Sequence, residues 1–540
     1  MRLLTLSLCV GAVVALWPIP RNIDTGTTLL KLAPSFDITL VDIDTPPQDL
    51  LDAIARTKSY LATDNLQRLV PDRGADDAPR LLNAPSLPSL QLSLSGPVRP
   101  IKDEAILPLG TRQERYSLTV PADGTHALLT AQSTLGLFRG LTTFSQLWYQ
   151  SEATTYAWQT PVNIVDDEPA FPYRGFMLDT ARNFFPVPDI KRTLDAMSWV
   201  KLNTFHWHVV DSQSFPLHVP AFPDLASNGA YSPAEIYSPS DVQDIVDYAG
   251  VSPWQRGIDV LLEIDTPGHT AVLATTHPEH IACLDASPWS DYANEPPAGQ
   301  LRIASPDTTN FTATLIKEIA AMVPRNSYFS TGGDEVNVNC YLRDAETSEE
   351  LAKRGVGIEE VLGEFVQSVH EVLREGGKTP VVWEEMVLAH ANVGLGKDTL
   401  VMVWISSQHA AAVAAKGFRI VHAPSDYFYL DCGAGEWLGN NHKGNSWCDP
   451  FKTWQKAYTF DPYAGLGEAQ RELVLGGQQL LWTEQADPAN LDSIVWPRAA
   501  SAAEVFWTGH TLPDGTPRAQ GVGKALPRLH DLRYRMAGEV

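Results

Sequence analysis

One pattern repeats through the chain after Pro169: a short apolar run, a loop, and a stretch with the apolar spacing of a helix. Short apolar runs are typical of buried parallel strands, and a helix after each strand returns the chain for the next one. We count eight runs, at residues 174–178, 204–210, 260–264, 328–331, 381–383, 401–405, 420–423 and 479–482. Eight strands that alternate with helices predict a (β/α)8 barrel, with its active site at the carboxyl ends of the strands.

Helical spacing follows most of these runs. The predicted helices cover residues 188–201, 240–249, 308–323, 357–375, 408–416 and 493–507, whereas the fifth unit has only a weak signal between 388 and 397. One weak unit does not change the fold class. We therefore expect an α/β protein with a catalytic TIM barrel over residues 169–540.

The segment before the barrel has a different pattern of apolar and polar residues. Extended runs at residues 36–43 and 116–120 alternate with helical stretches at 50–62 and 134–148, and residues 71–100 are rich in Pro, Asp and Ser, which predicts a loop. We see no cluster of candidate catalytic residues there. The prediction is a small α/β domain over residues 17–168.

The first residues have the pattern of a secretory signal peptide, which we place at residues 1–16. Loss of Cys9 with the signal leaves four cysteines, Cys283, Cys340, Cys432 and Cys448. An even number in an oxidising compartment predicts two disulfides with three possible pairings, against the alternative of four buried thiols. Asn310 begins the one glycosylation sequon that we find. The chain is thus expected to be secreted.

The net charge is −24, from 64 acidic and 40 basic residues. Nucleic acids and anionic membranes attract basic proteins, so this balance argues against both as partners. After the signal, no apolar run is long enough to span a membrane. A neutral or cationic glycan would not be repelled.

The strongest catalytic candidate is the stretch Thr331-Gly332-Gly333-Asp334-Glu335, after the fourth predicted strand. The glycines allow a ligand to approach the backbone closely. Two neighbouring carboxyl groups shift each other's pKa, so that one can remain protonated as a general acid while the other is ionised. An Asp-Glu pair alone is usually a solvated loop, but its place at a barrel strand end favours catalysis.

The adjacency of the two acids has a geometric consequence. Consecutive side chains on an extended backbone point to opposite sides. Asp334 and Glu335 would therefore not flank one glycosidic bond as an ordinary nucleophile and acid do. One can protonate the leaving oxygen while the other supports a nucleophile that belongs to the substrate, which is the substrate-assisted scheme.

Histidines and acids follow the second and third strands, in residues 206–211 and 263–269. A zinc site is one interpretation of His-x-His beside acids, but no zinc signature such as His-Glu-x-x-His is present. We favour histidines that orient and tune the catalytic acid from between carboxylates. The plain alternative for at least one of His206 and His208 is a histidine packed inside the barrel. No metal or other cofactor is expected.

Three later strands end in tryptophan, at Trp383, Trp404 and Trp482. One tryptophan at a strand end is usually core, but three at equivalent ends suggest an aromatic box around an apolar group or a sugar face. Tyrosines and acids lie near them in the sequence: Tyr427, Tyr429, Asp431 and Glu484. Such groups suit glycan hydroxyls, which both donate and accept hydrogen bonds.

Together these segments resemble glycoside hydrolase family 20, the β-N-acetylhexosaminidases, over nearly the whole chain after the signal. Residues 16–20 and 429–433 look like secreted fungal members in particular. Six stretches carry the resemblance: Arg174-Gly175-Phe176-Met177-Leu178-Asp179, Phe205-His206-Trp207-His208, Glu263-Ile264-Asp265-Thr266-Pro267-Gly268-His269, Gly332-Gly333-Asp334-Glu335, Trp482-Thr483-Glu484 and Trp496-Pro497-Arg498.

The resemblance implies a reaction and its catalytic residues. It implies exo-acting, retaining hydrolysis of terminal β-linked N-acetylglucosamine or N-acetylgalactosamine through an oxazolinium intermediate, with chitobiose, chitooligosaccharides or N-glycan termini as substrates. Glu335 matches the general acid and later base, and Asp334 the residue that orients the acetamide and stabilises the intermediate. Tyr429 matches the donor to the acetamide oxygen. Asp211 and His269 match the network that supports Glu335.

The resemblance also implies how the sugar is bound. Arg174 matches the residue that binds the O3 and O4 hydroxyls, with Asp431 and Glu484 as its partners at O4 and O6. The acetamide methyl and the sugar ring would lie against Trp383, Trp404 and Trp482. The implied disulfides are Cys283 with Cys340 and Cys432 with Cys448. Members of the family are often dimers, although no feature of this sequence tests a homodimer.

Two departures from the family pattern are visible. Gln478-Gln479 replaces a Glu-containing segment that commonly precedes the last strand's tryptophan, and Leu261-Leu262 precedes Glu263 where a proline is common. Neither touches a proposed catalytic atom. Two other functions are less consistent with the residues: a conventional retaining glycosidase with Asp334 as covalent nucleophile, and a glycan-binding barrel without activity.

Overall fold

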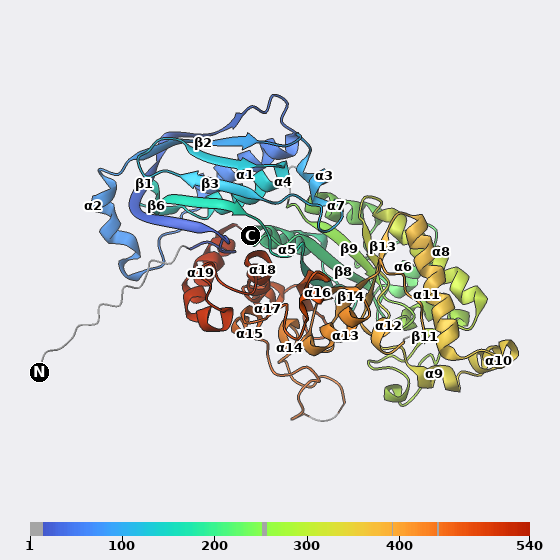
Figure 1. Cartoon of the computed structure of the whole chain (residues 1–540). Coiled ribbons are helices and arrows are strands. Elements are labelled where there is room, and N and C mark those ends of the chain that lie inside the picture. Colours follow the sequence, from blue (N-terminus) through green and yellow to red (C-terminus); the bar gives the residue numbers. More distant parts are fainter. Residues whose placement is uncertain (1–14, 251–255, 391, 440–441, 540) are drawn as a thin grey trace, which may run out of the picture. The chain divides into compact units, whose positions relative to one another are not determined.

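The computed structural model describes residues 15–250, 256–390, 392–439 and 442–539, so nearly all of the predicted signal peptide lies outside the described residues (Figure 1). The chain divides into two compact units. The first comprises residues 1–100, 113–169 and 507–540, and the second comprises residues 101–112 and 170–506. Residues 507–540, which the sequence predicts to be part of the barrel domain, thus belong to the first unit.

A six-stranded sheet, ordered β1-β2-β4-β3-β6-β5, forms the first unit. Strands β1 and β4 run parallel to β2, whereas β1, β3 and β5 run antiparallel to β6. The strands are β1 (Ile23–Val41), β2 (Ser86–Leu94), β3 (Tyr116–Val120), β4 (Ala127–Ala131), β5 (Tyr149–Ser151) and β6 (Thr154–Asp167). The helices are α1 (Gln48–Thr63), η1 (Pro71–Asp77), α2 (Ala78–Leu81), α4 (Thr134–Ser145) and α19 (Arg518–Glu539).

The prediction of a loop over residues 71–100 is wrong for β2, which pairs with two neighbouring strands. Its Ser and Pro content hides an alternation in which Leu87, Leu90 and Leu92 are fully buried. Pro88 lies opposite an irregularity in β1, between Leu32 and Asp37. A proline without an N–H is tolerated in a strand at such a bulge.

Helix α19 belongs to the first unit because its arginines bind groups there. The Arg535 guanidinium contacts Asp64 at 2.8 Å and donates to the Trp148 carbonyl at 2.7 Å. Arg528 donates to the carbonyl of Leu16 at 2.9 Å. Leu16 is the last residue of the predicted signal peptide and is fully buried in this unit. Cleavage after residue 16 would remove that hydrogen bond.

The second unit is a closed parallel barrel, which confirms the predicted (β/α)8 architecture. Every predicted barrel run overlaps a strand, because these runs are apolar on both faces and flanked by turn residues. In barrel order the strands are β7 (Tyr173–Asp179), β8 (Thr204–Val210), β9 (Asp259–Ile264), β12 (Tyr328–Ser330), β13 (Thr379–Trp383), β14 (Leu400–Val403), β15 (Arg419–His422) and β16 (Val474–Leu481).

Helices follow the barrel strands in the chain. The main ones are α5 (Val187–Trp199), α7 (Pro239–Gly250), α8 (Pro306–Met322), α11 (Ile358–Glu375), α13 (Ala410–Ala415) and α18 (Arg498–Thr508). The weak fifth unit contains only the short α12 (Glu385–Leu388). The single helix predicted over residues 493–507 is instead two, α17 (Leu491–Val495) and α18. Pro497 separates them because it has no N–H for a continuous helix.

Short elements lie in the loops between strands and helices. They are α3 (Ile101–Ala105), α6 (Pro223–Gly229), η2 (Ala271–Thr275), η3 (Pro278–His280), β10 (Ile281–Ala282), η4 (Trp289–Asp291), β11 (Gln300–Leu301), α9 (Val338–Arg343), α10 (Ala345–Arg354), η5 (Ser407–His409), α14 (Ser425–Phe428), α15 (Trp454–Tyr458) and α16 (Glu468–Arg471). Over the part of the chain described above, no helix is both long and apolar enough to cross a membrane.

The amino end of the barrel is closed by the segment 101–112. Arg112 forms a buried ion pair with Asp259 at 2.9 Å, and the Leu109 N–H donates to the Tyr328 hydroxyl at 3.1 Å. Asp259 and Tyr328 are the first residues of β9 and β12. Access to the barrel interior is therefore left to the opposite end, where the strands' carboxyl ends lie.

Candidate active site

Asp334 and Glu335 follow the end of β12 and line a pocket at the carboxyl ends of the strands. Gly332 and Gly333 lead to them with φ values of 63° and 95°. Glycine adopts such left-handed backbone at little cost, and a Cβ on Gly332 would collide with Asp265. Glu335 itself has a φ of 57°. Strain of this kind in a residue other than glycine is concentrated at functional sites.

Asp334 lies against a second carboxyl group, that of Asp265, just after β9. Burial and the charge of Asp265 raise the pKa of Asp334 well above its usual range. Burial likewise raises the pKa of Asp265 to about 7, although the Gly333 N–H donates to its Oδ1 at 2.7 Å. Asp334 Oδ1 is buried without a hydrogen-bond partner among the described residues. An open buried acceptor suits a ligand donor, such as the N–H of an acetamide.

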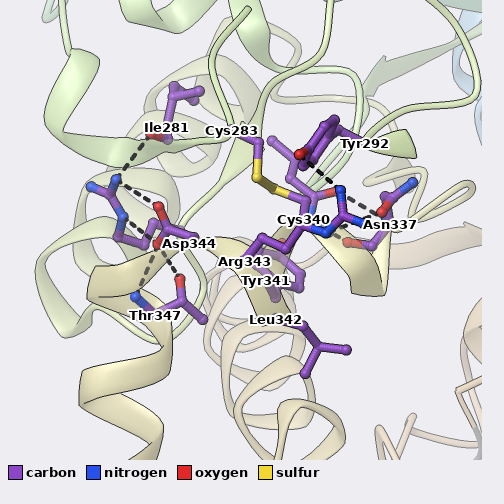
Figure 2. The surroundings of a disulfide bond; sticks show 12 residues. Ile281, Cys283, Tyr292, Asn337, Cys340, Tyr341, Leu342, Arg343, Asp344 and Thr347 are labelled. Carbon is purple, nitrogen blue, oxygen red and sulfur yellow. Dashed lines mark hydrogen bonds and ion pairs between the residues drawn. A yellow bond between two sulfur atoms is a disulfide. The ribbon is translucent and has the colours of Figure 1, made fainter. Parts of the chain in front are cut away.

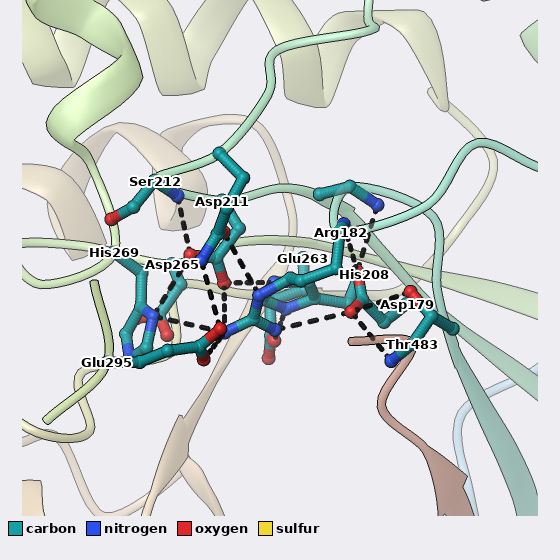
Figure 3. Close-up of polar contacts among 12 residues, drawn as sticks. Asp179, Arg182, His208, Asp211, Ser212, Glu263, Asp265, His269, Glu295 and Thr483 are labelled. Atoms are coloured by element: carbon teal, nitrogen blue, oxygen red, sulfur yellow. Dashed lines mark hydrogen bonds and ion pairs between the residues drawn. The ribbon is translucent and has the colours of Figure 1, made fainter. Parts of the chain in front are cut away.

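Glu335 is connected to the barrel interior through His269 and Asp211. His269 Nε2 lies 3.3 Å from Glu335 Oε2, and its Nδ1 lies 3.1 Å from Asp211 Oδ1. Burial by itself would lower the pKa of His269, but the charges and hydrogen bonds of Asp211, Glu335 and Asp265 together outweigh it, and the pKa lies well above its usual value. Figure 3 shows Asp211 between His269, His208 and Arg182. Glu335 therefore has a neighbour able to exchange a proton with it.

An aromatic wall faces the two acids. Trp404 and Tyr429 stack with ring centroids 6.1 Å apart and planes 17° apart, and Trp482 lies 6.4 Å from Tyr429. Trp404 is held by its Nε1, which donates to Glu385 Oε2 at 2.7 Å. Trp383 is almost fully buried and lies 6.3 Å from Trp482, behind the residues that line the pocket. Rigid aromatic surface of this kind suits a sugar face and an acetamide methyl group.

Polar groups lie on the other side of Trp482. Arg182 is 5.0 Å from the centroid of its ring, and the guanidinium forms ion pairs with Glu295 and Asp211, each at 2.9 Å. Glu484 Oε1 is 4.0 Å from Arg182 Nη1. Burial raises the pKa of Glu484 well above its usual range. A guanidinium among carboxyl groups offers fixed donors and acceptors for sugar hydroxyls.

Asp431, two residues after Tyr429 in the sequence, contributes a further hydrogen-bond acceptor to this pocket. Burial raises its pKa to about 7, and its buried Oδ1 has no hydrogen-bond partner within the described chain. The Cys432–Cys448 disulfide follows directly. Asp431 thus lies where a sugar hydroxyl could satisfy it.

The prediction that Arg174 binds the sugar is wrong. Arg174 is near the amino end of β7 and fully buried, and it donates to the backbone carbonyls of Lys201 and Phe171 at 2.9 and 3.0 Å. The pocket lies at the other end of this strand, where Asp179 accepts from Arg182. Arg182 comes three residues after the motif that begins with Arg174, and the direction of the strand places only Arg182 at the pocket.

We expect Arg182→Lys to raise KM by about 10- to 100-fold, because an ammonium cannot reproduce the fixed fork of hydrogen bonds. Arg174→Lys is the matched control. It should lower the melting temperature, since it disturbs buried backbone carbonyls, but leave KM close to the wild-type value. Michaelis constants and thermal unfolding of both variants test the assignment. A KM raised by Arg174→Lys alone would reverse it.

Two long loops with disulfides build the rest of the pocket. Cys283 is joined to Cys340 in α9, as the resemblance implied (Figure 2). The enclosed segment carries Trp289 and Glu295 to the pocket. The Cys432–Cys448 loop carries Trp437 and Trp447, and its pairing is also confirmed. A disulfide limits the freedom of the loop it closes. The resulting cavity of about 610 Å³ is large enough for a ligand.

The donor atoms fit a carboxylate–histidine network better than a metal site. Asp265, His269 and Asp334 could approach one ion, but both ring nitrogens of His269 already face carboxylates. Asp431 is near two sulfurs, but these form a disulfide and are not thiolates. A zinc ligand needs a free lone pair or a thiolate. We therefore assign Asp265, His269 and Asp334 to proton transfer and charge stabilisation, and Asp431 to binding of a sugar hydroxyl, rather than to a metal ion.

The pKa shifts in the barrel predict how stability depends on pH. Folding raises the pKa of Asp265 and Asp431 to about 7, of Glu385 to about 8 and of His208 to about 9. Each group binds its proton more tightly in the folded chain, so its stabilisation is present below the unfolded pKa and lost as the pH rises through the folded one.

Buried His370 and His422 have lowered pKa values of about 3 and about 4 and act in the opposite direction below about pH 6.5. We therefore expect the melting temperature to fall as the pH rises from about 7 to about 9. Thermal unfolding in buffers across this range measures it. Glu385→Gln removes one of the raised groups and should make the fall less steep. A melting temperature that increases with pH over this range would contradict the assigned directions.

Several residues of the site were not predicted. Arg182 follows the end of β7 by three residues, so the strand-end rule could have identified it. Asp265 was quoted in a motif, but its contact with Asp334 depends on the neighbouring positions of β9 and β12 in the barrel. Glu295 comes from a loop without periodic signal. Glu385 is adjacent to Trp383-Glu384, and only the fold shows which of the two acids faces the pocket.

These features define a class, a barrel glycosidase in which neighbouring carboxyl groups face an aromatic sugar pocket. Sequence similarity then gives the family. Residues 171–510 match the catalytic domain of glycosyl hydrolase family 20, and residues 16–147 match a domain described as beta-acetyl hexosaminidase like. The chain belongs to glycosyl hydrolase family 20, as the motifs implied, and is a glycoside hydrolase of the β-hexosaminidase type.

Individual proteins agree with this family. The chain is 37% identical over 441 residues to a beta-hexosaminidase of Arthroderma benhamiae, covering 78% of this chain and 69% of the relative. It is 34% identical over 417 residues to a chitooligosaccharidolytic beta-N-acetylglucosaminidase of Bombyx mori, covering 75% and 68%. The fold matches the Flavobacterium johnsoniae chitobiase with a TM-score of 0.75, at 24% identity, over 97% of this chain and 72% of that one.

Proposed function

We propose that this chain removes terminal β-linked N-acetylglucosamine or N-acetylgalactosamine from glycans, with the substrate's acetamide as nucleophile. The observation that carries the proposal is the open, buried Oδ1 of Asp334 beside the aromatic wall. An acetamide N–H fits this acceptor, and its methyl group fits the apolar surface of Trp404 and Trp482. The acetamide carbonyl oxygen then lies toward the anomeric carbon.

In the first step Glu335 is the general acid. The acetamide oxygen attacks the anomeric carbon, the bond to the leaving oxygen breaks, and Glu335 donates its proton to that oxygen. The cyclic oxazolinium that forms carries a positive charge. That charge favours the ionised form of Asp334, whose pKa is otherwise raised by burial and by Asp265, and the ionised carboxylate stabilises the intermediate. Tyr429 donates to the acetamide oxygen and holds it in line for attack.

In the second step Glu335 is the general base. It takes a proton from water, water attacks the anomeric carbon, and the oxazolinium opens to restore the acetamide. Two displacements at the same carbon retain its configuration. Asp211 and His269 keep Glu335 oriented in both steps through the contacts at 3.1 and 3.3 Å. No bond forms between the sugar and the protein.

The sugar hydroxyls are bound by Asp431 and Glu484, as the resemblance implied, and by Arg182, which takes the role first assigned to Arg174. These groups are nearly enclosed, so they surround a terminal sugar and favour exo-acting hydrolysis. Chitobiose and chitooligosaccharides are the substrates that we propose, because relatives of this chain include chitooligosaccharidolytic enzymes. N-glycan termini offer the same terminal sugar.

We also propose that the chain is secreted. Two disulfides are typical of proteins folded in an oxidising compartment. Asn310 of the sequon is exposed on α8, where a glycan could be attached. The signal peptide, the occupancy of Asn310 and a homodimer remain predictions.

The test is the hydrolysis of p-nitrophenyl N-acetyl-β-glucosaminide by the wild-type protein, beside p-nitrophenyl β-glucoside, which lacks the acetamide. We expect release of p-nitrophenol from the first substrate only, because the second contains no internal nucleophile. Comparable rates on both would mean that the protein supplies the nucleophile. That result would refute the proposed mechanism.

A further inference from the structure

The polar network behind Glu335 continues beyond Asp211, along the inside of the barrel. His208 Nε2 is 2.9 Å from Asp211 Oδ2, and its Nδ1 is 2.6 Å from Glu263 Oε1. The other oxygen of Glu263 lies 3.0 Å from His206 Nε2. His206, His208 and Glu263 are all fully buried. Burial of three ionisable groups is costly unless their charges are matched, so their protonation is tightly constrained.

His208 must be an imidazolium. Both of its ring nitrogens face carboxylate oxygens, and each can interact favourably only by donating a proton. Burial lowers the pKa of His208, but the hydrogen bonds to Asp211 and Glu263 raise it to about 9. This buried cation lies between two buried carboxylates, one of which, Asp211, also pairs with Arg182 at 2.9 Å. The contact with His208 contributes to the charge on Asp211, and hence to the proton that Asp211 holds on His269.

Gln478 determines which ring nitrogen of His206 carries the proton, at the far end of this series of hydrogen-bonded side chains. Its Oε1 accepts from the Tyr173 hydroxyl at 2.5 Å, and its Nε2 lies 3.5 Å from Met402 Sδ, which can only accept. The same Nε2 is 3.0 Å from His206 Nδ1. Nδ1 must then be the acceptor, so the single proton of a neutral His206 is on Nε2, directed at Glu263.

We propose that Gln478 is a positioning residue for Glu335, which acts through His206, Glu263, His208, Asp211 and His269. By donating to His206 Nδ1, it directs the Nε2 proton of His206 at Glu263, which also accepts from the Ser330 hydroxyl and faces His208 with its other oxygen. His208 in turn donates to Asp211. Asp211 accepts from His269 Nδ1, which orients His269 Nε2 toward Glu335. The inference rests on the proposed role of Glu335 as general acid.

A carboxylate at position 478 would reverse this effect. It cannot donate, so His206 would have to carry a proton on Nδ1. His206 would then compete with His208 for Glu263 as a second cation, or would draw a proton onto Glu263. Either outcome weakens the ion pair between Glu263 and His208.

Gln478→Glu tests the proposal with almost no change of shape. We compare kcat/KM for aryl N-acetyl-β-glucosaminides whose leaving groups need protonation, such as 4-methylphenol, or do not, such as 2,4-dinitrophenol. General acid catalysis is worth about 10²- to 10⁴-fold. Partial loss of general acid catalysis in Gln478→Glu should reduce kcat/KM by about 10-fold for the 4-methylphenyl substrate. For the 2,4-dinitrophenyl substrate it should reduce kcat/KM by less than about 3-fold. An equal fall on both substrates, or none, would overturn the proposal.

Gln479→Met is the matched control. Gln479 is the next residue of β16, so its side chain points to the opposite face of the strand. It is 1% exposed, and neither atom of its amide has a hydrogen-bond partner within the described chain. Gln479→Met should leave both kcat/KM values near the wild type. A selective loss in this variant would show that any change in β16 produces the effect, and would overturn the assignment to Gln478.

A second measurement needs no variant and no activity. Neutron diffraction from crystals of the perdeuterated wild type should place deuterium on Nε2 alone of His206 and on both nitrogens of His208. Deuterium on His206 Nδ1 would overturn the proposal. Because this result is independent of turnover, failure of the inference is distinguishable from failure of the proposed function.

Discussion

Asp334→Asn is expected to lower kcat on p-nitrophenyl N-acetyl-β-glucosaminide by about 10³-fold. The asparagine side chain keeps the shape of aspartate but has no negative charge to stabilise the oxazolinium. Its amide can also turn its NH₂ group toward the acetamide N–H, where two donors would oppose each other. The loss should appear mainly in kcat, because the charge on the sugar develops only after binding.

A stable thiazoline analogue of the intermediate separates this explanation from simple misfolding. Its inhibition constant should rise in Asp334→Asn by a factor close to the loss in kcat, since both depend on the same charge. The inhibition constant of neutral N-acetylglucosamine should change much less. Unchanged kcat in the variant, or equal loss of affinity for both inhibitors, would exclude a charge-stabilising role for Asp334.

The barrel could be predicted because its signals are local. Each strand is a short apolar run buried on both faces, and polar residues such as Asp334 and Glu335 come directly after one of them. The parallel arrangement then brings strand ends from distant parts of the chain together. Asp211, His269 and Glu335 all follow strand ends, and the family resemblance implied that they act together.

Strand direction explains the error at Arg174. The motif that begins with Arg174 does not by itself show which end of its strand faces the ligand. Arg174 is the second residue of β7, whereas Arg182 comes after its last residue. In a parallel barrel the active site is at the carboxyl ends of the strands. The position of each arginine relative to β7 therefore predicts better than the motif which of them reaches the ligand.

Contacts that depend on barrel register or on long loops could not be predicted from local patterns. Glu295 reaches Arg182 from a loop that is fixed by the Cys283–Cys340 disulfide. Gln478 was noted only as a departure from the family pattern, and its contact with His206 joins residues 272 positions apart. Such pairs follow from which strands are neighbours and which side chains point inward, and both require the closed barrel.

Glu335→Gln should cause a loss that depends on the leaving group. Glutamine cannot donate a proton to the departing oxygen, so kcat/KM for a 4-methylphenyl N-acetyl-β-glucosaminide should fall by about 10³- to 10⁴-fold. A 2,4-dinitrophenyl substrate leaves as a stable anion without that proton, and its kcat/KM should fall by less than about 10-fold. The variant also lacks the base for the second step, so its kcat should fall for both substrates.

Steady-state kinetics with a series of aryl substrates of increasing phenol pKa measure this dependence. In the wild type log kcat/KM should vary little with that pKa, because Glu335 protonates every leaving group, whereas in Glu335→Gln it should fall steeply. His269→Gln should be intermediate, since it removes the partner at 3.3 Å but keeps the acid itself. Parallel lines for wild type and Glu335→Gln would mean that another group protonates the leaving oxygen.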